Sequence, residues 1–190
     1  MTPSRSEKQL IKDCLRGKSA AQKQLYDQFA AKMFGVCLRY AKNYHIAEDL
    51  LQEGFVKVFR YLEKYKGTGS FEGWIRRIFI NTAIEHYRRS NPMYSVVEVK
   101  EKDASEIDNA ALQELAVDDL LQLVNELSDG YRVVFNLYAI EGYTHREIAE
   151  LLGISEGTSK SQLARARNIL KEKIASRFSE TYDAYVRQRL

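Results

Sequence analysis

The sequence predicts an all-α fold in which two small helical domains are joined by an acidic linker. Only two prolines and ten glycines are spread over 190 residues, whereas Leu, Ala, Lys, Glu, Arg and Gln recur at helical spacing. Apolar residues make up 45% of the chain, which is enough to build hydrophobic cores. An acidic stretch with little periodicity separates two segments of different charge, and no segment has a convincing strand pattern.

The domain boundaries follow the charge. Residues 1–92 contain 17 Lys and Arg against 9 Asp and Glu, whereas residues 93–120 contain 2 against 8. The acidic part begins after Asn91-Pro92, a pair that breaks helices, and its own charge should keep it extended. We therefore predict an N-terminal domain over residues 1–92, a linker over 93–112, a C-terminal domain over 113–176 and a tail of unassigned role over 177–190.

Three helical patterns fill the N-terminal domain, over roughly residues 20–41, 46–65 and 70–89. In the second of them, one arc of the helix is apolar and predicts the side that packs into the core. Its members are Ala47, Leu51, Gly54, Phe55, Val58 and Leu62.

Another arc of this second helix combines acidic and apolar side chains. It carries Glu48, Asp49, Gln52 and Glu53, followed by Val56 and Phe59. A purely solvated face would mix charges of both signs, so we interpret this arc as a docking face for a basic partner helix. The alternative is a solvated acidic patch with Phe59 tucked under a neighbouring helix.

The third helix follows the glycine-containing stretch KGTG and has Ser70 as its expected N-cap. One arc presents an indole, an amide and guanidinium groups: Trp74, Arg77, Asn81, Ile84, Glu85 and Arg88. Aromatic rings stack on unpaired bases, amides read base edges and arginines follow phosphates, so this arc favours a platform for single-stranded DNA. Because a lone tryptophan is more often a core residue, that alternative stays open for Trp74.

Two short helical patterns separated by a glycine lie in YTHREIAELLGISEGTSKSQLARAR, residues 143–167. Thr144 and Glu147 have the spacing of a capping box, which predicts the start of the first helix. Gly153 predicts its left-handed stop, and Ser155 predicts the N-cap of the second helix.

The second helix, expected over residues 156–173, has an apolar seam and a basic outer face. The seam consists of Leu163, Ala166, Leu170 and Ile174, and the outer face carries Gly157, Lys160, Ser161, Ala164, Arg165 and Asn168. Five Lys or Arg against one Glu between residues 157 and 173 make this helix suited to DNA. The C-terminal domain is therefore predicted to contain a helix-turn-helix that places its second helix in the major groove. A plain helical hairpin with a solvated basic face is the alternative.

Patterns of catalysis, metal binding and membrane insertion are not recognisable in the sequence. His45 and Glu48 are three residues apart, but the repeated Glu-x-x-His of di-iron bundles is missing. Cys14 and Cys37 lack CxxC spacing and are expected to be small buried residues. We therefore expect no enzyme, no metal, no cofactor and no small-molecule substrate. With neither an apolar span nor a signal core, the sequence predicts a cytoplasmic protein.

Three blocks of the chain, in this order and spacing, resemble the extracytoplasmic-function (ECF) sigma factors of bacteria. They are AEDLLQEGFVKVFR at 47–60, FEGWIRRIFINTAIEHYRR at 71–89, and the helix-turn-helix block at 143–167, which an acidic linker precedes. The likeness runs from about Leu10 to Ile174. It implies a dissociable subunit that binds RNA polymerase core and directs it to promoters.

The resemblance also implies a role for individual positions. In this family, the segment corresponding to Asp49, Gln52, Glu53 and Phe55 docks on a coiled coil of the largest core subunit, and we include the neighbouring Val56 and Phe59. The stretch resembling residues 71–89 opens and reads the −10 promoter element as a single strand, with Asn81 at the position that holds a flipped base. The candidate contacts to the −10 element are Phe71, Trp74, Arg77, Asn81 and Arg88.

The positions of Lys160, Ser161, Ala164 and Arg165 match those that approach the −35 element in the major groove, and we include the nearby Thr158. The acidic linker resembles a segment that threads toward the polymerase active site, where its charge mimics nascent RNA. Members of the family are usually held inactive by an anti-sigma factor, which we expect here too. Ser159 departs from the family because its position is usually apolar and buried, which predicts a less firmly anchored recognition helix.

Two rival functions each fit part of the sequence. A free-standing dimeric regulator would bind a palindromic duplex without polymerase and would have no use for an acidic docking face. A module that only sequesters a partner would leave the basic helix at 157–173 unexplained.

Overall fold

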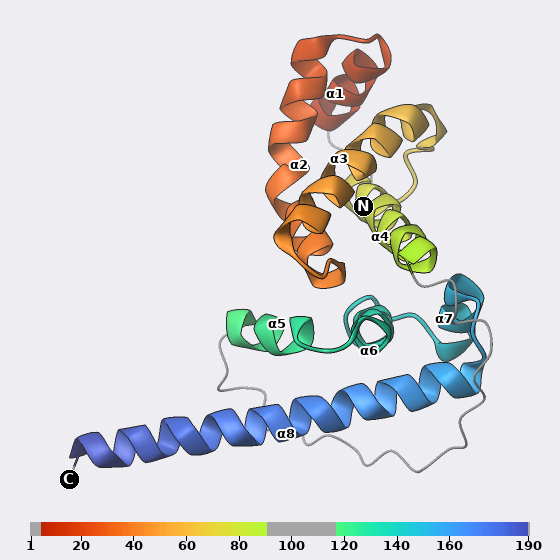
Figure 1. The fold of residues 1–190 in the computed structure, drawn as a ribbon. Coiled ribbons are helices and arrows are strands. Elements are labelled where there is room, and N and C mark those ends of the chain that lie inside the picture. Colours follow the sequence, from red (N-terminus) through yellow and green to blue (C-terminus); the bar gives the residue numbers. More distant parts are fainter. Residues whose placement is uncertain (1–4, 91–116, 190) are drawn as a thin grey trace. The chain divides into compact units, whose positions relative to one another are not determined.

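The computed structural model describes residues 5–90 and 117–189, with side chains described within 6–90 and 120–177. The described residues form helices and no strand, and they fall into two compact units that divide between Ser90 and Asn91 (Figure 1). The prediction of an all-α fold is thus confirmed. The linker predicted over 93–112 lies outside the described residues. None of the described helices has the apolar length required to span a lipid bilayer.

The N-terminal unit is a small bundle in which α2, α3 and α4 pack against one another and α1 packs on α2. Its helices are α1 (Arg5–Leu15), α2 (Ser19–Tyr40), α3 (Tyr44–Tyr61), which ends in a 3-10 turn, η1 (Leu62–Lys64), and α4 (Phe71–Ser90). Helix α1 was not among the three helices predicted for this domain, although its buried residues Leu10 and Cys14 have the four-residue spacing of a helical stripe. Helix α3 starts at Tyr44 since the side chain of Asn43 accepts a hydrogen bond from the amide of Ile46.

The packing of α3 and α4 corrects two assignments made from helical periodicity. Leu50 is only 2% exposed, whereas Leu51, which the periodicity placed in the core, is half-buried. Ile84 was expected beside the DNA platform but is buried. Both differences arise because α3 contacts α2 and α4 together, and α4 contacts α2 and α3, so the buried arc of each helix is wider than one stripe.

One glycine allows α3 and α4 to approach closely. A Cβ atom added to Gly54 would lie 2.2 Å from Cε1 of Phe79, whose ring is itself buried. Phe79 also packs edge-on against Phe55, with 5.3 Å between ring centroids. The crossing of the two helices therefore depends on the missing side chain at Gly54.

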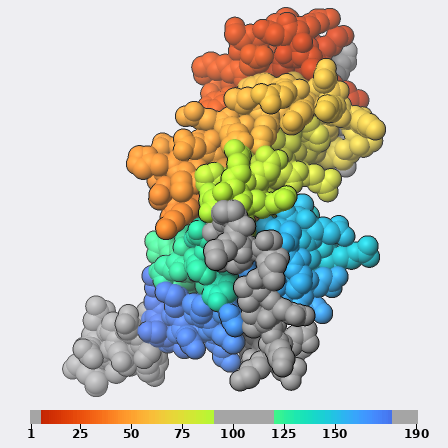
Figure 2. Space-filling model, turned by 45° about the vertical axis from the view of Figure 1, so that its right-hand side comes forward, coloured from red at the N-terminus to blue at the C-terminus, as the bar shows by residue number. Residues whose placement is uncertain are grey.

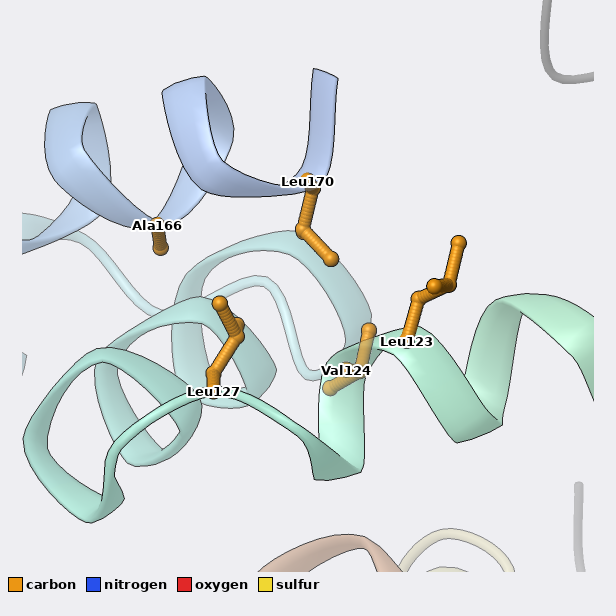
Figure 3. Packing of buried hydrophobic residues seen from close by; sticks show 5 residues of the cluster. All are labelled: Leu123, Val124, Leu127, Ala166 and Leu170. Carbon is orange, nitrogen blue, oxygen red and sulfur yellow. The ribbon is translucent and has the colours of Figure 1, made fainter. Parts of the chain in front are cut away.

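The described part of the C-terminal unit contains four helices, of which the last is the longest. They are α5 (Val117–Asn125), α6 (Asp129–Phe135), which continues into a π-helical turn, η3 (Asn136–Ile140), α7 (His145–Leu152) and α8 (Glu156–Arg189). Helices α5, α6 and α7 all pack on α8. Figure 3 shows the core, in which three side chains on and just after α5 face two on α8: Leu123, Val124 and Leu127 opposite Ala166 and Leu170.

Helix α8 extends to Arg189, well beyond the end expected near residue 173 and across the boundary drawn at 176. After Gly157 the helix contains neither glycine nor proline, so the sequence holds no strong stop. The expected seam is confirmed for Leu163, Ala166 and Leu170, which are buried, and Ile174 packs partly buried against the same core.

Candidate docking and nucleic-acid surfaces

The acidic face of α3 lies largely in solvent within the N-terminal unit. We use this name for Glu48, Asp49, Gln52, Glu53, Val56 and Phe59. The side chains of Glu48, Asp49 and Gln52 are exposed, and Val56 is 55% exposed, whereas Glu53 and Phe59 are half-buried. An exposed branched apolar side chain among carboxylates is suited to contact the stem and charge of a basic partner helix.

Phe55 does not belong to this face. Its side chain is 3% exposed and packs between Tyr26 of α2, at 4.6 Å between ring centroids, and Phe79 of α4. We therefore assign it a supporting place beneath the acidic face and not a contact with a partner. Tyr26 is partly exposed beside Phe55, and sequence reasoning missed it because the link between them exists only when α2 packs on α3.

Glu53 is already paired within the chain. Its carboxylate lies 2.9 Å from the ammonium of Lys57 and accepts a hydrogen bond from Arg89 of α4 at 3.0 Å. Lys57 also reaches Glu85 of α4 at 2.7 Å. Burial raises the pKa of Glu53, but the hydrogen bonds from Lys57 and Arg89 outweigh it and lower that pKa overall. This network ties the acidic face of α3 to the helix that carries the predicted DNA platform.

The platform on α4 is an exposed stripe with an aromatic end. Arg77, Asn81 and Arg88 are exposed, and the second half of α4 lies at the surface of its unit, as the yellow-green atoms in Figure 2 show. Trp74 is half-buried, and its ring stacks on that of Phe71 at 5.8 Å with 10° between the planes. Phe71 is buried, so it supports Trp74 from below. Trp74 thus joins the core on one side and meets solvent on the other.

The loop before α4 is closed beside this aromatic pair. The hydroxyl of Tyr65 donates to the carbonyl of Gly69 at 3.1 Å, and its ring lies 5.4 Å from that of Trp74. Gly67 and Gly69 both have left-handed φ angles, 71° and 79°, which glycine adopts without strain. Ser70 accepts from the amide of Gly73 at 2.9 Å, which confirms the predicted N-cap.

The helix-turn-helix has the caps that the sequence predicted. Thr144 accepts from the amide of Glu147, whose carboxylate accepts in return from the amide of Thr144 at 2.8 Å. These hydrogen bonds lower the pKa of Glu147. Gly153 has a left-handed φ of 69°, and Ser155 accepts from the amide of Thr158 at 2.9 Å. The two helices therefore start and stop through local hydrogen bonds.

The predicted DNA face of α8 has two exposed cations and three half-buried small residues. Lys160 and Arg165 are exposed, whereas Thr158, Ser161 and Ala164 are half-buried. The guanidinium of Arg165 donates to the hydroxyl of Tyr131 at 3.4 Å, which holds the charged end of this side chain beside α6. Lys160 and Arg165 thus bring positive charge to this face of α8.

A polar contact missed by sequence reasoning connects the two helices of this motif. Ser159 is 0% exposed, and its Oγ lies 2.9 Å from Nδ1 of His145, the first residue of α7. The imidazole of His145 stacks on the ring of Tyr138 at 4.6 Å. Burial lowers the pKa of His145, and the charges of Lys160 and Arg167 lower it further. The departure at Ser159 therefore introduces a hydrogen bond where an apolar contact was expected.

Within the described parts of the chain, no group of three or more His, Cys, Asp and Glu side chains is placed to hold a metal ion. Cys14 and Cys37 are both buried free thiols, as expected from their spacing, and burial raises the pKa of Cys37 to about 12.

Comparison with known proteins places the two units in one family. The family model described as Sigma-70 region 2 matches residues 25–92, and the one described as Sigma-70, region 4 matches residues 118–170. The first covers α2 to α4 and the second covers the helix-turn-helix together with α5 and α6.

Curated relatives match this chain over most of its length. The ECF RNA polymerase sigma factor SigE of Mycolicibacterium smegmatis is 31% identical over 83% of this chain, which spans 63% of that protein's length. The ECF RNA polymerase sigma factor SigW of Bacillus subtilis is 28% identical over 88% of this chain and 96% of its own. Among solved structures, the sigma factor RpoE of Bartonella quintana, in complex with the anti-sigma factor NepR, has a TM-score of 0.47 at 21% identity and covers 79% of this chain and 94% of its own. With region 2 in the N-terminal unit, region 4 in the C-terminal unit and ECF relatives along most of its length, the chain belongs to the ECF family of RNA polymerase sigma factors.

Proposed function

We propose that the chain directs RNA polymerase to promoters by binding the core enzyme through the acidic face of α3 and promoter DNA through α4 and α8. The observation that carries this proposal is the presence of two sigma regions on separate helical units, each with an exposed surface of matching chemistry. We propose no covalent step, because the task is to position the polymerase and to hold opened DNA. Its place of action is the cytoplasm, where core polymerase and the chromosome are found.

The acidic face supports docking on a basic coiled coil of the largest core subunit. Asp49 and Gln52 supply exposed polar contacts, and Val56 supplies an apolar anchor between them and Phe59. Glu53 contributes less directly, since its carboxylate holds Lys57 and Arg89. Contacts of this kind combine long-range steering with a small dehydrated centre.

The stripe on α4 supports binding of the opened −10 element. Removing a base from the duplex costs a few kcal/mol, and stacking on an aromatic ring returns about 1–3 kcal/mol per base. The exposed side of Trp74 offers such a ring, Asn81 offers an amide for a base edge, and Arg77 and Arg88 offer charge for the backbone. Phe71 acts only through its support of Trp74.

The face of α8 supports binding of the −35 element as duplex. Lys160 and Arg165 would contact phosphates, while Thr158, Ser161 and Ala164 lie where base edges pass a recognition helix. Since phosphate contacts release counterions, promoter binding should weaken steeply with salt. An inhibitory anti-sigma partner that covers these surfaces and the acidic face would keep the factor silent.

Reconstitution with core polymerase tests the proposal. The chain should bind core polymerase and produce promoter-dependent run-off transcripts from a library of bacterial promoter fragments. Asp49→Lys should abolish binding to the core, whereas Glu63→Lys, a charge reversal at an exposed acid outside the acidic face, should not. Lys160→Ala with Arg165→Ala should retain core binding and lose transcripts.

The rival functions predict different results. A free-standing regulator would bind a palindromic duplex without polymerase and would tolerate Asp49→Lys. A sequestering module would tolerate the loss of Lys160 and Arg165. A wild-type chain that neither binds the core nor yields any transcript would refute the proposed function.

A further inference from the structure

The contacts of His145 form a bracket along α8. Starting from α8, the hydroxyl of Ser159 meets Nδ1 of His145 at 2.9 Å, and the imidazole stacks on Tyr138 at 4.6 Å with 23° between the planes. The ring of Tyr138 then meets the guanidinium of Arg167, 5.6 Å from the ring centroid, which returns the chain of contacts to α8. We call these four residues the His145 bracket.

The bracket spans the part of α8 that is proposed to read DNA. Ser159 and Arg167 are eight residues apart, which is roughly 12 Å along a helix. Between them lie Lys160, Ser161, Ala164 and Arg165. One end of this DNA-facing stretch is therefore tied to α7 through Ser159, and the other end is tied to the turn η3 through Arg167.

The hydrogen bond restrains α8 in a way that an apolar contact would not. An apolar side chain can pack over a range of rotations of its helix, whereas a hydrogen bond needs the donor, proton and acceptor nearly in line. Ser159 is fully buried, so losing its partner would leave a polar atom without compensation. The stack on Tyr138 fixes the plane of the imidazole, and burial together with the charges of Lys160 and Arg167 lowers the pKa of His145, which favours the neutral ring.

We propose that His145 and Ser159 are positioning residues for −35 recognition: their hydrogen bond sets the rotation and depth of the first turns of α8, and with them the base preference of the DNA face. This inference rests on the proposed function and deepens it. It concerns preference among sequences, because a helix that rotates by a few degrees keeps its phosphate contacts while its small side chains lose their base edges.

The test measures base preference with wild-type and variant holoenzyme. Wild-type holoenzyme first selects binding sequences from duplex DNA randomised over a promoter-length window. Preference is then the ratio of its affinity for a selected duplex to its affinity for the same duplex with the −35 bases scrambled. The variants are Ser159→Ala, His145→Phe, which retains a flat ring to stack on Tyr138, and His145→Asn, which retains a polar group near the position of Nδ1. Ser176→Ala, at an exposed serine further along α8, is the matched control.

Ser159→Ala and His145→Phe should each reduce the preference roughly tenfold, since each breaks the same buried hydrogen bond. Their combination should reduce it no further, because the two residues act as one unit. His145→Asn and the control should stay within about twofold of the wild type. Affinity for the scrambled duplex and for core polymerase should be unchanged in all variants.

Several results would overturn the inference. Ser159→Ala could retain the wild-type preference, His145→Asn could lose as much as His145→Phe, or the variants could lose affinity equally for selected and scrambled duplexes. If Ser159→Ala fails to fold, the two His145 variants decide between these results. A wild-type holoenzyme that selects no sequence would instead refute the proposed function, so the two failures are distinguishable.

Discussion

Gly54→Ala should destabilise the N-terminal unit, although the same change stabilises most helices. In a helix interior, alanine is favoured over glycine by about 1 kcal/mol. At Gly54, however, the new Cβ would lie 2.2 Å from Cε1 and 2.6 Å from Cζ of Phe79, a ring with no exposed side toward which it could turn. Relieving such a contact requires α3 and α4 to separate, and overpacking of this kind costs about 1–3 kcal/mol. With the contact so short, we expect the upper end of that range and a net loss of about 2 kcal/mol.

Urea unfolding followed by the fluorescence of Trp74 measures this effect. Trp74 is the only tryptophan and lies on α4, so its signal reports the unit in which the change is made. With a typical urea dependence of about 2 kcal/mol per molar, the midpoint should fall by about 1 M. Gly35→Ala is the matched control, because Gly35 lies on α2 with nothing within 4 Å of the added Cβ. That variant should gain about 0.5–1 kcal/mol.

A double variant checks the cause. Phe79→Leu removes the ring atoms that the new Cβ would meet, so Gly54→Ala should cost less in that background than in the wild type. The reasoning fails if Gly54→Ala has the midpoint of the wild type or a higher one, because the close approach would then not control how α3 crosses α4.

Three further predictions test the roles assigned to individual side chains. Val56→Asp should abolish core-polymerase binding with an unchanged urea midpoint, because Val56 is exposed. Phe55→Ala should lose about 3–4 kcal/mol of stability, because Phe55 is buried. Equal effects of the two variants on stability would contradict the assignment of Val56 to the docking surface and of Phe55 to the core. Thr144→Ala should speed amide hydrogen exchange in α7 roughly fivefold at pH 7. The pKa of Glu147 is lower in the folded chain than its usual 4.5. The stabilisation that its carboxylate gives to the cap is therefore present above pH 4.5 and is lost as the pH falls through the folded pKa. The exchange rates of the variant should accordingly approach those of the wild type in acid. Glu53→Gln should reduce the free energy of unfolding by under about 1 kcal/mol, and by less in high salt, because the ion pairs of Glu53 are partly exposed. A loss of stability that salt does not reduce would contradict this expectation.

The helix-turn-helix could be predicted almost completely from the sequence. Its helix ends are set by signals that act within four residues: the capping box of Thr144 with Glu147, the left-handed Gly153 and the N-cap Ser155. Each helix end therefore depends on atoms that are near neighbours along the chain. The same holds for Ser70 before α4. Helix α1 was missed, although the four-residue spacing of its buried Leu10 and Cys14 is a local signal too.

The candidate site was predicted less completely, for a different reason. Periodicity placed Phe55 in the core, whereas the family resemblance placed it among the docking residues, and the packing of α2 on α3 buries it. Ile84 shares an arc with Asn81 on a helical wheel, yet its side chain is buried, because α2 and α3 both pack on α4. Glu53 looks like a docking acid until Arg89, 36 residues away, is brought to its carboxylate.

By itself, the sequence determined that the chain is helical, where its DNA-binding motif begins and turns, and how charge is divided between the two domains. The tertiary structure alone decided which polar groups pair across helices, as His145 does with Ser159 over 14 residues, and which side chains of each helix remain accessible. Helix caps and periodicity are local, since they involve residues within one turn. Burial and pairing depend on which other helix lies opposite, and that is a property of the assembled bundle.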